Sequence, residues 1–145
     1  MTMRMKTIVV DASLTASLLL PDEDAKAAQR LIASAHANGD ALIAPSHYVI
    51  ELLSVFGSAR TRKRISAQEQ VDFFREAMAL PIALIPDRPP AERVYFLCDK
   101  HHLSPYDATY LALALHEGAQ LATIDARLAA AAKSEGILWS QTKKK

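Results

Sequence analysis

The sequence predicts an α/β domain in which a mostly parallel sheet is covered by helices on both faces. Short runs of β-branched and apolar residues, bounded by Gly, Asp or Pro, alternate with longer segments of helical periodicity. Such alternation implies right-handed strand-helix-strand crossovers, which build parallel sheets. A chain of 145 residues has the size of one ordinary domain. We expect one domain over residues 1–140, followed by a basic tail at 141–145.

Five apolar runs are the candidate strands. The first, Thr7-Ile8-Val9-Val10, is apolar enough for a strand that is buried on both faces. The runs lie at residues 7–10, 41–44, 82–85, 121–124 and 137–139. A turn at Asn38-Gly39 precedes the second run, and prolines after Ile85 mark the loop that leaves the third.

Helices are expected between these runs, because apolar residues recur there at i, i+3, i+4 and i+7. The pattern is clear at residues 28–35, 49–56, 94–101 and 108–115. Two consecutive helices, at about 46–60 and 67–79, separate the second and third strands. The basic run Arg60-Thr61-Arg62-Lys63-Arg64 would form the tip that joins them.

Composition excludes several classes of protein. Hydrophobic residues make up 50% and charged residues 23%, which is typical of globular chains and not of disordered ones. The net charge of +1 excludes a broad polycation, so any affinity for nucleic acid must come from local patches such as Arg60 to Arg64. The single cysteine, Cys98, excludes an internal disulfide framework and fits a reducing compartment. Since no apolar run reaches the roughly 20 residues of a membrane span, we expect a cytoplasmic protein.

Two aspartates directly follow predicted strands. Asp11 comes after residues 7–10 and Asp125 after residues 121–124. In doubly wound sheets, ligands bind beyond the carboxyl ends of the strands where strand order reverses, and the first and fourth strands commonly flank that point. Two carboxylates about 4 Å apart repel by roughly 4 kcal/mol at an effective dielectric of about 20. A divalent cation would relieve this repulsion, so the pair predicts a metal site.

Each aspartate also has a purely structural explanation. Asp11 and Asp125 are plausible helix N-caps. Asp107 lies in Ser104-Pro105-Tyr106-Asp107, where Ser and Asp at this spacing form a capping box with Pro at the first helical position. Ser13 and Thr123 supply either ordinary caps or hydroxyls that support a cation site. A functional role for Asp107 is favoured only because Asp11 and Asp125 are also present.

Glu51 is the weakest candidate on physical grounds. It lies about 200° around its helix from Val49, opposite the apolar stripe and on the same face as His47 and Ser54. Periodicity alone therefore predicts that Glu51 faces solvent.

No other metal or phosphate motif is present. The sequence lacks GxGxxG, GxxxxGK[ST] and HExxH, and its five histidines show no paired ligand spacing. Oxygen ligands without His or Cys favour Mg²⁺ or Mn²⁺ over Zn²⁺.

Four blocks together resemble the PIN-domain family, and most closely its VapC-type ribonuclease toxins. The blocks are Val9 to Ser13, Pro45-Ser46-His47 leading to Glu51, Ser104 to Ala114, and Leu121 to Leu128. They cover nearly the whole chain in the family's order and spacing. One departure is Leu52-Leu53-Ser54, where many relatives carry Asn close behind the Glu.

The resemblance implies a three-layer α/β/α domain with a five-stranded parallel sheet and a Mg²⁺- or Mn²⁺-dependent endoribonuclease. It assigns the acidic site to Asp11, Glu51, Asp107 and Asp125, with Ser13 and Thr123 as supporting hydroxyls. It also implies a homodimer held by a small antitoxin. As a hypothesis, Asp11 and Asp107 are the direct metal ligands, Asp125 and Glu51 bind a second ion or orient water, and Arg60, Arg62, Lys63 and Arg64 bind RNA phosphates.

Two other functions compete with this interpretation. Asp11-Ala12-Ser13-Leu14-Thr15 partly resembles the nucleophile motif of haloacid dehalogenases, although that motif usually has a second Asp where Ser13 stands. The other alternative is a PIN-like module that binds RNA or protein without cutting. The presence of all four acidic positions argues against it.

Overall fold

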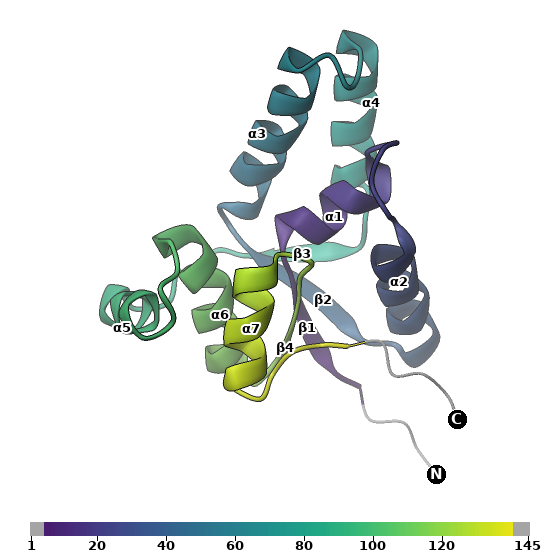
Figure 1. Ribbon diagram of the computed structural model, residues 1–145. Coiled ribbons are helices and arrows are strands. Elements are labelled where there is room, and N and C mark those ends of the chain that lie inside the picture. The colour runs from purple at the N-terminus through teal and green to yellow at the C-terminus, as the bar shows by residue number, and fades with distance from the viewer. Residues whose placement is uncertain (1–4, 141–145) are drawn as a thin grey trace.

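A computed structural model describes residues 5–140, which form four strands and seven helices (Figure 1). The strands are β1 (Thr7–Val10), β2 (Ala41–Pro45), β3 (Ile82–Ile85) and β4 (Gln120–Ala122). The helices are α1 (Ala12–Leu19), α2 (Lys26–Asn38), α3 (Tyr48–Thr61), α4 (Ala67–Met78), α5 (Ala91–His101), α6 (Pro105–Glu117) and α7 (Ala126–Ser134). The predicted basic tail, 141–145, lies outside the described residues.

All strand pairs in the sheet are parallel, in the order β3-β2-β1-β4. Val10 of β1 is in register with Ala122 of β4, and the backbone N–H of Asp11 continues this ladder by donating to the Ala122 carbonyl at 3.0 Å. Strand order reverses at β1, so the residues after β1 and β4 border the crevice where this architecture binds ligands. The predicted parallel sheet and its reversal point are confirmed.

The prediction of a fifth strand at residues 137–139 is wrong for the part of the chain described. This segment makes one parallel bridge, between Leu138 and Leu121, in which Leu121 donates to Ile137 and accepts from Trp139. Gly136, with a left-handed φ of 75°, turns the chain immediately before it, and polar Ser140 follows. The pairing is limited to this single bridge, so the segment is not a strand, although its three apolar residues have strand-like composition.

Helices cover both faces of the sheet. On one face, Ile8 and Val10 pack with buried residues of α2 such as Leu31. On the other, Val9 and the buried side chains of α3 and α6 belong to a second, larger cluster. Side chains of a strand alternate between faces, so β1 contributes to both cores and is buried from Ile8 onward. Asp11 therefore directly follows a strand that is buried between both cores.

Helices α3 and α4 form a hairpin that projects beyond the sheet (Figure 1). A full capping box starts α4: Ser66 accepts the N–H of Glu69, whose carboxylate accepts the N–H of Ser66. Arg64, in the connecting turn, donates to both carboxylate oxygens of Asp22 at 2.7 and 2.6 Å and to Glu23 at 3.3 Å. These bonds fasten the tip of the hairpin to the segment between α1 and α2.

None of the helices within residues 5–140 combines the length and the apolar character that a membrane span requires.

Candidate active site

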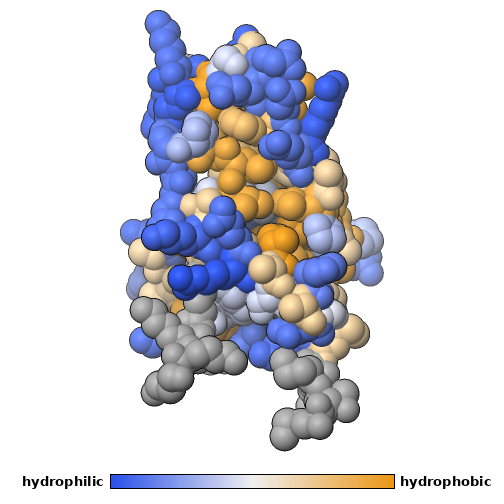
Figure 2. Space-filling view, turned by 90° about the vertical axis from the view of Figure 1, so that its right-hand side faces the viewer, coloured by the Kyte–Doolittle hydropathy of each residue, from blue (hydrophilic) through white to orange (hydrophobic). Residues whose placement is uncertain are grey.

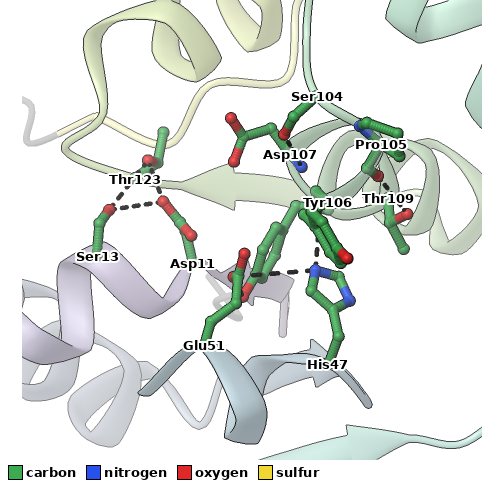
Figure 3. Close-up of polar contacts among 11 residues, drawn as sticks. Asp11, Ser13, His47, Glu51, Ser104, Pro105, Tyr106, Asp107, Thr109 and Thr123 are labelled. Carbon is green, nitrogen blue, oxygen red and sulfur yellow. Dashed lines mark hydrogen bonds and ion pairs between the residues drawn. The ribbon is translucent and has the colours of Figure 1, made fainter. Parts of the chain in front are cut away.

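Asp11 is the most deeply buried acidic residue of the described chain, at 4% exposure. It stands at the N-cap position of α1, yet its side chain makes no capping bond. Instead, its Oδ2 accepts the hydroxyls of Ser13 and Thr123, each at 2.6 Å (Figure 3). Capping therefore does not explain this carboxylate.

The supporting hydroxyls come from the two neighbouring strand ends. Ser13 lies in the first turn of α1, and Thr123 follows β4 directly. Thr123 Oγ1 also accepts the backbone N–H of Asp125 at 3.0 Å, and it lies 3.5 Å from Ser13 Oγ. One threonine thus links the Asp11 carboxylate to the loop that carries Asp125.

Asp125 and Asp107 both stand where the sequence predicts helix starts. One carboxylate oxygen of Asp125 accepts the N–H of Leu128 at 2.9 Å and caps α7. At the start of α6, Ser104 Oγ accepts the N–H of Asp107 at 3.1 Å, with Pro105 in the first turn. Ser104 supplies this cap, so the Asp107 side chain remains available to the crevice.

Glu51 does not face open solvent as its helical position predicts. It is half-buried, and its Oε1 accepts the hydroxyl of fully buried Tyr110 at 2.6 Å. His47, the N-cap residue of α3, brings its Nε2 to 3.9 Å from the same oxygen. The start of α3 borders the sheet edge, so the polar face of this helix points into the crevice.

All four predicted carboxylates line one crevice of about 230 Å³. Figure 3 shows three of them, Asp11, Glu51 and Asp107. Asp11 comes from the end of β1, Glu51 from α3, Asp107 from α6 and Asp125 from the turn before α7. Ser13 and Ser54 also line the crevice. No Lys or Arg is among the described residues that line it. The crevice is therefore strongly acidic.

Burial and mutual repulsion act on these carboxylates in the same direction. Burial raises the pKa of Asp11 above its ordinary value, the nearby charge of Asp125 adds to this, and the two hydroxyls oppose it. Burial also raises the pKa of Glu51 and of Asp107, and the charge of Asp11 adds to both shifts. Burial lowers the pKa of His47, so this side chain adds no compensating charge at neutral pH.

A hydrated divalent cation fits this donor set. The acidic side chains that face the crevice offer oxygen ligands, as hard cations require, and no Lys or Arg is among the described residues that line it. No three acidic, His or Cys side chains within residues 5–140 are gathered tightly enough to form a closed metal cage. Mg²⁺ commonly keeps several waters and takes only one or two carboxylates, so an open crevice suits it.

The predicted RNA-binding residues lie at the far end of α3. Arg60 is nine residues beyond Glu51, which at 1.5 Å per residue is about 14 Å along the helix. Arg60 donates to Gln70 at 3.1 Å, and Arg64 is held by Asp22 and Glu23. Arg62 and Lys63 are exposed, and Lys63 has a left-handed φ of 62°.

Sequence reasoning missed Tyr110 and His47, which hold Glu51 in place. Tyr110 follows Asp107 by three residues on α6, the spacing that puts two side chains on one helix face. His47 precedes Glu51 by four residues on the same principle. Helical spacing from the acidic residues is thus the signal that identifies both.

The comparisons with known proteins agree with this geometry. A sequence profile of the PIN domain matches residues 8–134, which is most of the chain. The chain belongs to the PIN domain family. A protein named Ribonuclease VapC12, from two strains of Mycobacterium tuberculosis, is 32% identical over 122 residues, covering 84% of this chain and 89% of its own length.

Solved structures share the fold. PAE2754 from Pyrobaculum aerophilum superposes with a TM-score of 0.68 at 21% identity, over 87% of this chain and 79% of its own. VapC20 from Mycobacterium tuberculosis, described as a sarcin-ricin loop cleaving toxin, gives 0.61 at 20% identity, over 86% and 94%. FitAcB from Neisseria gonorrhoeae gives 0.59 at 16% identity, over 87% and 93%.

Proposed function

We propose that the protein is a Mg²⁺- or Mn²⁺-dependent endoribonuclease and the toxin of a toxin-antitoxin pair. The observation that carries this proposal is a single crevice lined by four carboxylates and, among its described lining residues, by no Lys or Arg. PIN nucleases generally use a divalent metal, and the curated relative is named a ribonuclease. The haloacid-dehalogenase alternative is set aside, because the PIN domain profile matches residues 8–134.

We assign Asp11 and Asp107 as the direct metal ligands. Asp125 and Glu51 would bind a second ion or orient the attacking water. A bound divalent ion supplies positive charge that lowers the pKa of a bound water and neutralises the phosphate oxygens during in-line displacement. The hydroxyls of Ser13 and Thr123 fix the orientation of the Asp11 carboxylate. Tyr110 fixes Glu51, so that its second oxygen can accept a hydrogen bond from water.

The test is cleavage of total cellular RNA by refolded protein freed of antitoxin, with Mg²⁺ or Mn²⁺. Discrete products are expected with the metal and not with EDTA, and Asp107→Asn should not form them. Asp99→Asn makes the same chemical change at an exposed position on α5 and should cleave normally. Absence of cleavage by folded, monodisperse wild-type protein would overturn the proposal.

We propose a cognate antitoxin as the protein partner. VapC toxins pair with antitoxins, and this chain offers an apolar surface on the side that carries α1, α2 and α4 (Figure 2). Val71 and Met78 of α4 are 43% and 40% exposed, and apolar residues of α1 and α2 line a shallow hollow beside β3. Surfaces of this kind commonly mark protein interfaces. Val71→Asp should weaken binding of the antitoxin encoded beside the gene, as measured by calorimetry.

We further propose a homodimer in the cytoplasm, and RNA phosphate contacts by Arg60, Arg62, Lys63 and Arg64. The single cysteine supports a reducing compartment. Light scattering should give twice the monomer mass. Of the four basic residues, exposed Arg62 and Lys63 should contribute most to RNA affinity, because Arg64 is held in its ion pairs. Alanine at Arg62 and Lys63 should reduce the salt dependence of binding.

A further inference from the structure

A second pocket, of about 280 Å³, lies beside the acidic crevice at the same edge of the sheet. Its walls come from the segments that follow β2 and β3 and from the first turn of α6. Its lining includes Pro45, His47, Asp87, Arg88, Pro105 and Tyr106. It thus occupies the carboxyl ends of two further strands, the edge where this architecture binds ligands.

A pair of rings separates this pocket from the acidic crevice. The rings of His47 and Tyr106 lie 5.8 Å apart, and His47 Nε2 donates to the backbone carbonyl of Tyr106 at 3.1 Å (Figure 3). Each ring is close to a residue of the acidic crevice. His47 Nε2 is 3.9 Å from the Glu51 carboxylate, and Tyr106 directly precedes Asp107 in the sequence. A chain bound in the crevice therefore has the pocket as its immediate neighbour.

The chemistry of the pocket differs from that of the crevice. Proline rings and the two aromatic rings give it flat apolar walls, while Arg88 adds a planar cation with several donors and Asp87 an acceptor. The Tyr106 side chain is 62% exposed, although it is large and aromatic and lies next to a proposed metal ligand. An exposed aromatic ring with a donor and an acceptor nearby suits a flat heterocycle with a polar edge.

We propose that this pocket binds an unpaired RNA base next to the phosphodiester held in the acidic crevice, with Tyr106 as the stacking surface and Arg88 and Asp87 contacting the base edge. This inference rests on the proposed function and adds the part of the substrate that the acidic residues do not contact. A base within a duplex is stacked and paired, so the pocket accepts single strands and loops. Guanine presents acceptors and donors together, which match Arg88 and Asp87.

Binding can be measured apart from cleavage. The probe is an eight-nucleotide single-stranded RNA of mixed sequence with a fluorescent label, together with eight versions that each lack one base. The protein carries Asp107→Asn and is kept in EDTA, which prevents cutting and reduces the repulsion of RNA by the crevice. In this background, Tyr106→Ala and Arg88→Ala are compared by fluorescence anisotropy with Phe96→Ala and Arg93→Ala, which alter exposed α5 residues outside the pocket.

Tyr106→Ala should weaken binding of the intact RNA on the order of tenfold, as expected for the loss of one stacked base. At one position, removing the base should weaken binding to the protein that retains Tyr106 as much as Tyr106→Ala weakens binding of the intact RNA. The same base removal should have no further effect on the Tyr106→Ala protein. Such non-additivity identifies the base that contacts the ring. Tyr106→Phe, which keeps the ring face, should regain most of the lost affinity. The two α5 variants should bind as the background does.

Three results would overturn the inference: additive losses at every position, equal binding by Tyr106→Ala and Phe96→Ala, or no RNA binding at all. If Tyr106→Ala and removal of one base are non-additive but the wild-type protein does not cleave RNA, the pocket inference stands and the nuclease proposal fails. If the wild-type protein cleaves RNA but the losses are additive, the nuclease proposal stands and the pocket inference fails. If Tyr106→Ala weakens only antitoxin binding, the pocket belongs to the protein partner and the proposal fails.

Discussion

Carboxylates occur in two contrasting settings in this molecule. Away from the crevice, Asp22 is bonded to Arg64, and Glu135 to Lys100 at 2.9 Å and His101 at 2.7 Å. These partners lower the pKa of both acids. In the crevice, burial and neighbouring negative charge raise the pKa of Asp11, Glu51 and Asp107. The first setting joins elements of the fold. In the second, no Lys or Arg is among the described residues that line the crevice, and the charge of Arg127 offsets only part of the rise in the pKa of Asp107.

The difference separates structural acids from functional ones. A protein that gathers carboxylates only for stability would pair them, as it does around Arg64. Like charges that remain gathered at a sheet edge cost folding energy in the absence of a ligand. Such a cost is common at functional sites and is offset by the rest of the fold. Changes in the two settings should therefore have opposite effects on stability and activity.

The largest effect is expected when a proposed metal ligand is changed. Asp11→Asn should lower the rate of RNA cleavage by at least about a hundredfold. Mutation of residues that only hydrogen-bond to metal ligands commonly lowers metal affinity or activity by about 10- to 100-fold, and loss of a ligand itself should cost more. Rates at increasing Mg²⁺ concentration will show whether added metal restores part of the loss. Asp99→Asn is the matched control. A wild-type rate for Asp11→Asn would remove this residue from the site.

A smaller effect is expected from the tyrosine behind Glu51. Tyr110→Phe removes only the hydroxyl that bonds Glu51, so we expect a loss in cleavage rate of about tenfold at limiting metal. Tyr48→Phe is the matched control, because it removes a buried tyrosine hydroxyl whose hydrogen bond, of 2.7 Å, is to Thr15 and not to Glu51. Both variants should lose similar stability in urea. If both lose activity equally, the Tyr110 hydroxyl acts only through folding.

The sequence predicted what depends on local pattern. The apolar runs located β1 to β4, and the strand ends brought Asp11 and Asp125 to one edge. It could not predict the direction of Glu51, because the helical period gives a face but not the neighbour of that face. The same limit applies to Leu53, which belongs to the predicted apolar stripe of α3 and is 45% exposed. Contacts between elements, such as Tyr110 with Glu51, depend on packing that no single segment encodes.

Without metal, the stability of the fold should fall as the pH rises and the crevice carboxyls lose their protons. A carboxyl with a raised pKa holds its proton in the folded state where the unfolded chain has lost it, so raising the pH above the ordinary value destabilises the fold. In EDTA at pH 7, Asp107→Asn should therefore melt a few degrees above wild type. Mg²⁺ should stabilise wild type more than the variant. A lower melting temperature for Asp107→Asn in EDTA would contradict this view of the crevice.

The smallest effect, with the opposite sign, is expected at the ion pair between Glu135 and Lys100. Glu135→Gln should lower the free energy of unfolding by about 1 kcal/mol in urea at pH 7 and leave the rate of RNA cleavage unchanged. Lys100 and His101 lower the pKa of Glu135, so its contribution is present above the ordinary value of 4.5 and is lost as pH falls through the lowered one. The difference between the two proteins should thus shrink in acid, where the crevice carboxyls become protonated and cease to repel. A difference that grew in acid would show that Glu135 stabilises the fold by packing and not by charge.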